Sequence, residues 1–312
     1  MEKTVSGQLL KSFLSYFWLR PENALTQTNR ALSLQKYLVQ ETDCAIDISC
    51  GDGVFSYICH GGILSPTDDM FQSIKIDKPR TADFDHFDHF EEDSHTINPL
   101  SKPHNFFHTG IDWKSTMLKK AGVLGAYTDL VLHDNNNKLK FQDDTFTYVY
   151  SNSIYWVDKI KEHATDIVRV CNSDGLILLH VKTRAMLLHT AAVYAPELGK
   201  NFADVIDAGR LNSYKGLLDL DQYIDMFRSV PGVYVEDVIP VYNGATARIW
   251  DIGLRPLFKP LFSMTRKIPK DELSEIKEEW VDTLHNLLQD TLHTPAKNIK
   301  DAMEFLIVIR KL

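Results

Sequence analysis

The feature that most constrains the fold of this chain is a short apolar run that is broken by a glycine turn. The stretch CAIDISCGDGVFS, residues 44–56, has apolar side chains at 45–48, then Gly51 and Gly53, and then a helical pattern from 54 to 60. Glycine lets a backbone turn sharply or approach a ligand closely. Strand, glycine turn and helix in this order are the start of an α/β unit.

More strands and helices alternate along the rest of the chain. The hydrophobic patterns predict strands at about 106–111, 129–133, 146–151, 176–181 and 305–310, and helices at 115–121, 158–171 and, capped by Asp219, at 220–227. This alternation predicts an α/β fold with a doubly wound, mostly parallel sheet and helices on both faces.

Two helical stretches precede the first strand, one at 9–18 that ends at Arg20-Pro21 and one at 29–39. We therefore divide the chain into an N-terminal helical cap, residues 1–40, and a main domain, residues 41–312. The main domain has two insertions, at about 64–105 and 243–300. The second contains a long amphipathic helix from 270 to 292.

The composition excludes several classes of protein. The chain has 34 Lys and Arg against 42 Asp and Glu, a net charge of −8 that argues against a nucleic-acid partner. No apolar run approaches the roughly 20 residues needed to span a bilayer. The four cysteines form no C-x-x-C pair, which fits a reducing compartment. We expect a cytoplasmic protein that binds neither nucleic acid nor membrane.

Polar and acidic residues follow the predicted strands at the point where each strand ends. These segments are DISCGDG, Asp112, HDNNN and SNSIYW. Ligands of open α/β sheets bind outside the carboxyl ends of the strands. Carboxylates and amides there suit a ligand with hydroxyls, an amine and a purine amino group. A triphosphate is disfavoured, because no G-K-[ST] follows the glycines.

Four segments in order resemble the class I S-adenosylmethionine-dependent methyltransferases. They are IDISCGDGVFS, GIDWKSTMLKKA, DLVLHDNNNKLKFQDDTFTYVYSNSIYWV and RVCNSDGLILLHVK, within residues 44–183. The resemblance implies a Rossmann-like fold with a seven-stranded sheet, S-adenosyl-L-methionine as cofactor, and methyl transfer by in-line displacement. The acidic charge and the lack of an Asn/Asp-Pro-Pro-aromatic tetrapeptide favour a small-molecule acceptor, such as a metabolite, sugar, lipid or natural-product intermediate.

The resemblance also implies which residues bind the cofactor: Asp47, Ser49, Gly51, Gly53, Asp112, Trp113, Asp134, Asn135 and Asn152. Asp112 corresponds to the acid that accepts both ribose hydroxyls, an arrangement that the two oxygens of a carboxylate suit. Trp113 then packs on the adenine, and Asp134 and Asn135 read its amino edge. Asn152 faces the methionyl portion and the acceptor.

Two departures from the family pattern leave alternatives open. Ser49 replaces the usual glycine, which is tolerable if its φ is negative and strained if its φ is positive. The interval from Gly53 to Asp112 is long, so Asp77 in SIKID is an alternative for the ribose acid. We prefer Asp112, since GIDWKSTML also supplies the following helix in register.

A catalytic base is needed only if the acceptor loses a proton, and we nominate Tyr155 and His180. His180 could equally be a core histidine, and Tyr155 could pack the following helix instead of lining an acceptor pocket. Arg20 and Glu22 either touch the acceptor or form an ion pair at a helix end. The run at 83–95, DFDHFDHFEEDSH, lacks the thiolates or the i, i+4 histidine pair of structural zinc sites, so we expect a lid or surface insertion and no metal.

Two other functions remain as alternatives. A nicotinamide-dependent oxidoreductase would need the first and third glycines of the dinucleotide fingerprint, and both are absent. A subunit that binds S-adenosylmethionine without catalysis would keep the cofactor site alone. A homodimer is an open alternative for the assembly.

Overall fold

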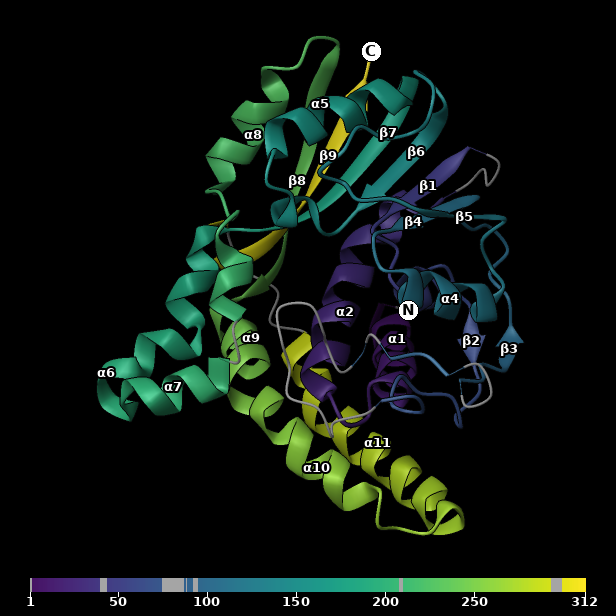
Figure 1. The fold of residues 1–312 in the computed structure, drawn as a ribbon, viewed down its shortest axis with the longest axis vertical. Helices are drawn as coiled ribbons and strands as arrows, with labels where there is room; N and C mark the ends of the chain where they lie inside the picture. Colours follow the sequence, from purple (N-terminus) through teal and green to yellow (C-terminus); the bar gives the residue numbers. More distant parts are fainter. Residues whose placement is uncertain are drawn as a thin grey trace.

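A seven-stranded sheet in the order β5-β4-β1-β6-β7-β9-β8 forms the centre of the computed structural model (Figure 1). The structure describes residues 2–39, 44–74, 87, 89–91, 95–207, 210–292 and 299–312. The strands are β1 (Ala45–Ile48), β4 (Thr109–Asp112), β5 (Asp129–Leu132), β6 (Phe146–Ser151), β7 (Cys171–Lys182), β8 (Val233–Asn243) and β9 (Ala302–Lys311). The first five run parallel, and β9 is antiparallel to both of its neighbours. The predicted mostly parallel, seven-stranded sheet is confirmed.

Helices that follow the strands cover the sheet, as the alternation predicts. They are α3 (Val54–Cys59), α4 (Ser115–Leu124), α5 (Ile160–Val170) and α8 (Leu220–Arg228). α5 and α8 lie side by side against β7 and β8 (Figure 1). Asp219 precedes α8, where its backbone N–H donates to Gln222 Oε1 at 3.0 Å, one half of the capping box that starts this helix.

The N-terminal helices begin and end at different residues from those predicted. α1 spans Glu2–Tyr16 and α2 spans Pro21–Leu34, so Pro21 starts a helix and does not end one. The reason is that proline at the first helical position needs no N–H partner and already has the helical φ. α1 packs along α11 (Lys270–Leu292), although the two are far apart in sequence (Figure 1).

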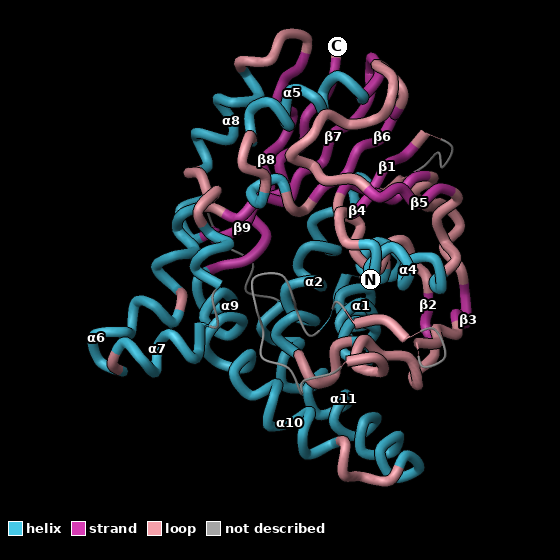
Figure 2. Tube along the Cα trace, in the orientation of Figure 1, coloured by secondary structure: helices cyan, strands magenta, loops and turns pink. Residues whose placement is uncertain are grey.

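Most of the remaining helices gather at the carboxyl end of the sheet (Figure 2). The second insertion contains α9 (Gly244–Arg248), a π-helix η7 (Ile249–Leu254), α10 (Phe258–Thr265) and α11. The segment between β7 and α8, with α6 (Ala195–Leu198) and α7 (Lys200–Asp207), was not predicted as an insertion. Within the first insertion, β2 (Ile63–Leu64) pairs with β3 (Pro99–Ser101). Among the described residues, no helix combines the length and hydrophobicity that a bilayer span requires.

Candidate active site

A cavity of about 630 Å³ opens where the parallel strands end, between the sheet and α2. Eight of the eleven residues predicted for the site line it: Ser49, Gly51, Asp112, Trp113, Asp134, Asn135, Asn152 and Tyr155. Asp47, Gly53 and His180 do not line it. The structure therefore brings residues from the ends of four strands to one cavity, as expected for an open α/β sheet.

The glycine turn after β1 has a left-handed backbone at three positions. The φ angles are 63° at Ser49, 60° at Gly51 and 77° at Gly53. Ser49 is thus in the strained conformation that the sequence left open. A Cβ on Gly51 would meet no atom within 4 Å, whereas one on Gly53 would lie 2.7 Å from Cε2 of Tyr127. Gly51 leaves space on the cavity side, and Gly53 is required for packing beneath the turn.

Asp112 ends β4 and joins that strand to the glycine turn. Its Oδ2 accepts the backbone N–H of Gly51 at 3.0 Å, and its Oδ1 accepts that of Lys114 at 2.8 Å. Burial raises the pKa of this carboxyl, although both hydrogen bonds oppose the shift. A carboxylate has about four acceptor sites. Asp112 can therefore accept two further hydroxyls from a ligand in the cavity that it lines.

Two polar atoms at the cavity have no hydrogen-bond partner among the described residues. Asn135 Nδ2 donates to Ser49 Oγ at 2.9 Å, but Asn135 Oδ1 is buried without a donor, and so is Ser153 Oγ. Buried polar atoms without partners are costly, so they point to a ligand that carries polar groups. Trp113 has 63% of its surface exposed and offers a flat apolar face at the same cavity.

Asp47 lies beneath the glycine turn and not in the cavity. Ser56 Oγ and Tyr127 O–H both donate to its Oδ2 at 2.6 Å. Burial raises the pKa of Asp47 to about 6. Asp47 therefore supports the glycine turn from below. It would affect ligand binding only indirectly, through the shape of this turn.

We expect Tyr127→Phe to destabilise the fold by about 2 kcal/mol at pH 8 and by about 1 kcal/mol at pH 5. Above pH 6 Asp47 is ionised, and a hydrogen bond to a charged group contributes more than one to a neutral group. The measurement is urea unfolding of both proteins at the two pH values. Tyr57→Phe is the control, because that hydroxyl donates to a backbone carbonyl, Ser101 O. Equal losses at both pH values would contradict the role of Asp47.

His180 does not line the cavity, which favours the core-histidine alternative over a role as base. It is fully buried, with Nε2 2.8 Å from Ser33 Oγ and Nδ1 3.0 Å from Tyr150 Oη. Burial lowers its pKa to about 3. Tyr155 does line the cavity, but burial raises its pKa and keeps its hydroxyl protonated near neutral pH.

Sequence reasoning missed the residues at the far end of the cavity, which are Lys182, Arg30, Tyr242 and Trp250. Lys182 is the last residue of β7, and Trp250 belongs to the π-helix η7. A lone lysine directly after the apolar run LILLHV is a pattern that could have pointed to Lys182. The other three come from α2, β8 and the second insertion, where no local pattern marks them.

Arg30 and Glu304 form a buried ion pair beside Lys182. The guanidinium of Arg30 donates Nε to Glu304 Oε1, and Nη2 to Oε2 at 2.8 Å. Tyr242 O–H donates to the same Oε2 at 2.9 Å. Burial alone would raise the pKa of Glu304, but the charge and hydrogen bond of Arg30 hold it at about 2. Both oxygens of this carboxylate are thus already paired.

Arg20 and Glu22 form a separate ion pair, with Arg20 Nε 2.5 Å from Glu22 Oε1. Neither residue lines the cavity, which favours the structural alternative over acceptor contact. Asp77 lies outside the described residues. The same holds for most of the run at 83–95, in which Phe87, His89–Glu91 and His95 are described.

Comparison with known proteins gives one family match. Residues 93–179 match the model of a family described as a methyltransferase domain. This segment contains β4, β5 and β6, ends within β7, and includes Asp112, Asn135 and Asn152. The match does not support the nicotinamide-dependent alternative. A comparison with curated protein sequences gives no match.

Several solved structures are similar to this chain at low sequence identity and low TM-score. An S-adenosylmethionine-dependent methyltransferase from Mesorhizobium loti is 14% identical, with 91% of this chain and 98% of that chain covered and a TM-score of 0.45. The protein solved in complex with the Haloferax volcanii Trm112 methyltransferase activator is 11% identical, with 94% and 93% covered and a TM-score of 0.46. A Haemonchus contortus N-methyltransferase with phosphomonomethylethanolamine and S-adenosylhomocysteine is 12% identical, with 96% and 57% covered and a TM-score of 0.46.

The fold and the cavity define a Rossmann-like α/β protein with a ligand site at the carboxyl ends of its parallel strands. Within this fold, residues 93–179 are similar to a methyltransferase domain, and β9 is inserted antiparallel between β7 and β8. The sequence resemblance and the family match agree on a methyltransferase domain over this segment.

Proposed function

We propose that this chain transfers the methyl group of S-adenosylmethionine to a small-molecule acceptor that binds in the same cavity. The observation that carries the proposal is the meeting of Asp112, Asn135 and the glycine turn at one cavity within the family-matched fold. The unpartnered Asn135 Oδ1 suits a donor such as the adenine amino group. The residues present therefore fit the cofactor.

Each cofactor residue has a separate task in this proposal. Asp112 accepts the ribose hydroxyls, and Trp113 covers the adenine. Gly51 lets the backbone approach the amino-acid portion, since no atom lies within 4 Å of where its Cβ would be. Asn152, at the end of β6, faces the methionyl end. When bound, the cofactor supplies a methyl group that is already activated by its sulfonium.

A small acceptor fits the space that remains. The whole cavity, about 630 Å³, lies within the range of small-ligand sites and must hold both partners. The far end is lined by aromatic rings, among them Phe17, Tyr155 and Trp250. Catalysis then depends largely on alignment of the acceptor with the methyl group in a site that excludes water.

Isothermal titration calorimetry tests this function. We expect S-adenosylmethionine and S-adenosylhomocysteine to bind with micromolar dissociation constants, and NADH not to bind. Absence of binding of both adenosyl compounds to a folded sample would overturn the proposal. Binding without turnover on any acceptor would instead support the non-catalytic subunit.

A further inference from the structure

The strand ends line the cavity in the order of the sheet, and Lys182 follows Asn152 in that order. Asp134 follows β5, Asp112 ends β4, and Asn152 follows β6. β7 is the next strand after β6, about 4.8 Å further along the sheet, and Lys182 is its last residue. If the proposed function holds, Lys182 lies just beyond the methionyl end of the cofactor, where the acceptor must bind.

The ammonium nitrogen of Lys182 lacks the partners that a buried cation normally has. The residue is 5% exposed, and its Nζ makes no hydrogen bond or ion pair with any described residue. Its neighbours are rings: Nζ lies 4.0 Å from the centroid of Trp250 and 5.9 Å from that of Tyr155. Burial favours the neutral amine, and the attraction of the indole face for a cation offsets this only in part.

The charged groups around Lys182 do not neutralise it. Glu304 lies directly opposite on β9, but Arg30 and Tyr242 already occupy its oxygens. On the other side, Arg210 Cζ also lies 4.0 Å from the centroid of Trp250, and its Nη1 is 3.5 Å from Asp251 Oδ1. Each carboxylate is thus paired with a guanidinium. Burial first, and then Arg30 and Arg210, lower the pKa of Lys182 to about 7.

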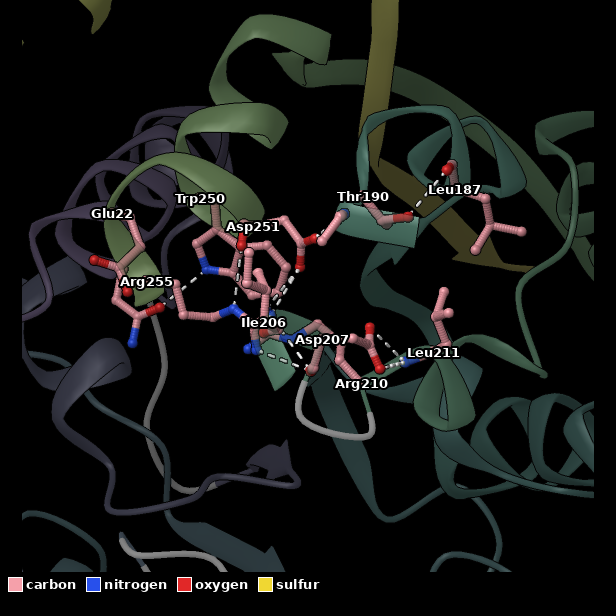
Figure 3. A network of polar contacts seen from close by, with 12 residues as sticks. Glu22, Leu187, Thr190, Ile206, Asp207, Arg210, Leu211, Trp250, Asp251 and Arg255 are labelled. Atoms are coloured by element: carbon pink, nitrogen blue, oxygen red, sulfur yellow. Dashed lines mark hydrogen bonds and ion pairs between the residues drawn. The ribbon is translucent and has the colours of Figure 1, made fainter. Parts of the chain in front are cut away.

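The ring that faces Lys182 is that of Trp250 in the π-helix η7. Figure 3 shows Trp250 among the polar contacts around this helix. Trp250 Nε1 donates to Asn23 Oδ1 at 2.9 Å, and Asp251 Oδ2 accepts the backbone N–H of Ala191 at 2.8 Å. Arg255 donates to the carbonyl of Ile206 at 2.7 Å. Single turns of π-helix are frequent at functional sites. These bonds hold the indole of Trp250 in place beside Lys182.

We propose that Lys182 is the catalytic base of the reaction and that the acceptor carries an acidic hydroxyl on a planar ring, as a phenol or enol does. Burial favours the neutral amine of Lys182, and the guanidiniums of Arg30 and Arg210 oppose its protonation more than Glu304 and Asp251 favour it. A neutral amine can take the proton of an acidic hydroxyl. The aromatic walls suit a flat molecule.

The step balances without any further reactant. The neutral Lys182 amine takes the hydroxyl proton while the acceptor oxygen forms a bond to the methyl carbon. The carbon–sulfur bond breaks, and its electron pair remains on sulfur in S-adenosylhomocysteine. Lys182 then releases its proton to solvent after the products leave.

The first test measures the ionisation of Lys182 without any acceptor. The protein with S-adenosylhomocysteine is labelled with acetic anhydride from pH 5 to 11, and each lysine is quantified by mass spectrometry. We expect half-maximal labelling of Lys182 near pH 7, below the ordinary range of a lysine. Half-maximal labelling of Lys182 in the ordinary lysine range, at about pH 10, would overturn the proposal. Binding of S-adenosylhomocysteine, measured separately, tests the cofactor site alone.

The second test distinguishes a Lys182 that acts as a base from a Lys182 that contributes only a positive charge. Catechol, 4-nitrophenol and benzylamine are offered with methyl-labelled S-adenosylmethionine to the wild type, Lys182→Arg and Lys182→Met. We expect transfer to a phenol, with kcat at least about 100-fold lower in both variants and cofactor affinity within about threefold of the wild type. Wild-type turnover by Lys182→Arg, or transfer to benzylamine alone, would contradict the proposal.

Discussion

Asp112→Ala is expected to weaken the binding of S-adenosylmethionine about 100-fold, which corresponds to about 2.7 kcal/mol. The variant loses a buried carboxylate that we assign to two ribose hydroxyls, and hydrogen bonds to charged groups contribute about 1.5–3 kcal/mol each. It also loses the bond that holds the Gly51 N–H. Titration calorimetry on both proteins measures the effect.

Asp129→Ala is the matched control for this change, because Asp129 is an exposed aspartate at the amino end of β5, away from the cavity. We expect its affinity to equal that of the wild type. Asp112→Asn keeps one acceptor oxygen and should fall between the two. Wild-type affinity in a folded Asp112→Ala protein would exclude Asp112 from the cofactor site and leave Asp77 as the candidate acid.

Glu304→Gln is expected to lower the free energy of unfolding by about 3–5 kcal/mol, the usual cost of removing one partner of a buried ion pair. The change leaves the buried guanidinium of Arg30 without its counter-charge. Urea unfolding at pH 7 measures the loss. A double variant, Arg30→Met with Glu304→Gln, should recover part of the lost stability. If the losses of the two single variants simply add up in the double variant, the ion pair between Arg30 and Glu304 is contradicted.

The pH dependence of this loss follows from the ionisation of Glu304. Its folded pKa is about 2, below the ordinary value of 4.5, so the ion pair stabilises the fold fully above about pH 4.5. The contribution falls as the pH drops through 2. The difference between wild type and Glu304→Gln should therefore be constant from pH 6 to 8 and shrink in acid.

The parts of the fold that have a strong local pattern could be predicted. LILLHV reads as a buried strand because both faces of β7 are covered, and the glycine turn after β1 requires left-handed φ angles. β8 was missed because Pro240 interrupts its pattern, and proline is tolerated in an edge strand such as this one.

The candidate site also has one part that could be predicted from the sequence and one part that could not. The cofactor end consists of residues that directly follow strands, so the sequence places Asp112 and Asn135 at one sheet edge. The acceptor end depends on contacts between distant segments: Arg30 on α2 meets Glu304 on β9, and Trp250 on η7 meets Lys182 on β7. His180 was nominated by residue type, yet it lies one pleat below the strand end, where Ser33 covers it.

A crystal structure with S-adenosylhomocysteine bound is the most direct test of the central claim, that side chains after neighbouring strands hold the adenosyl group and direct its sulfur toward Lys182. The expected result places the ribose hydroxyls at Asp112, the adenine amino group at Asn135, and the sulfur on the side of β7. A nucleoside bound elsewhere, or a sulfur that faces away from Lys182, would contradict it.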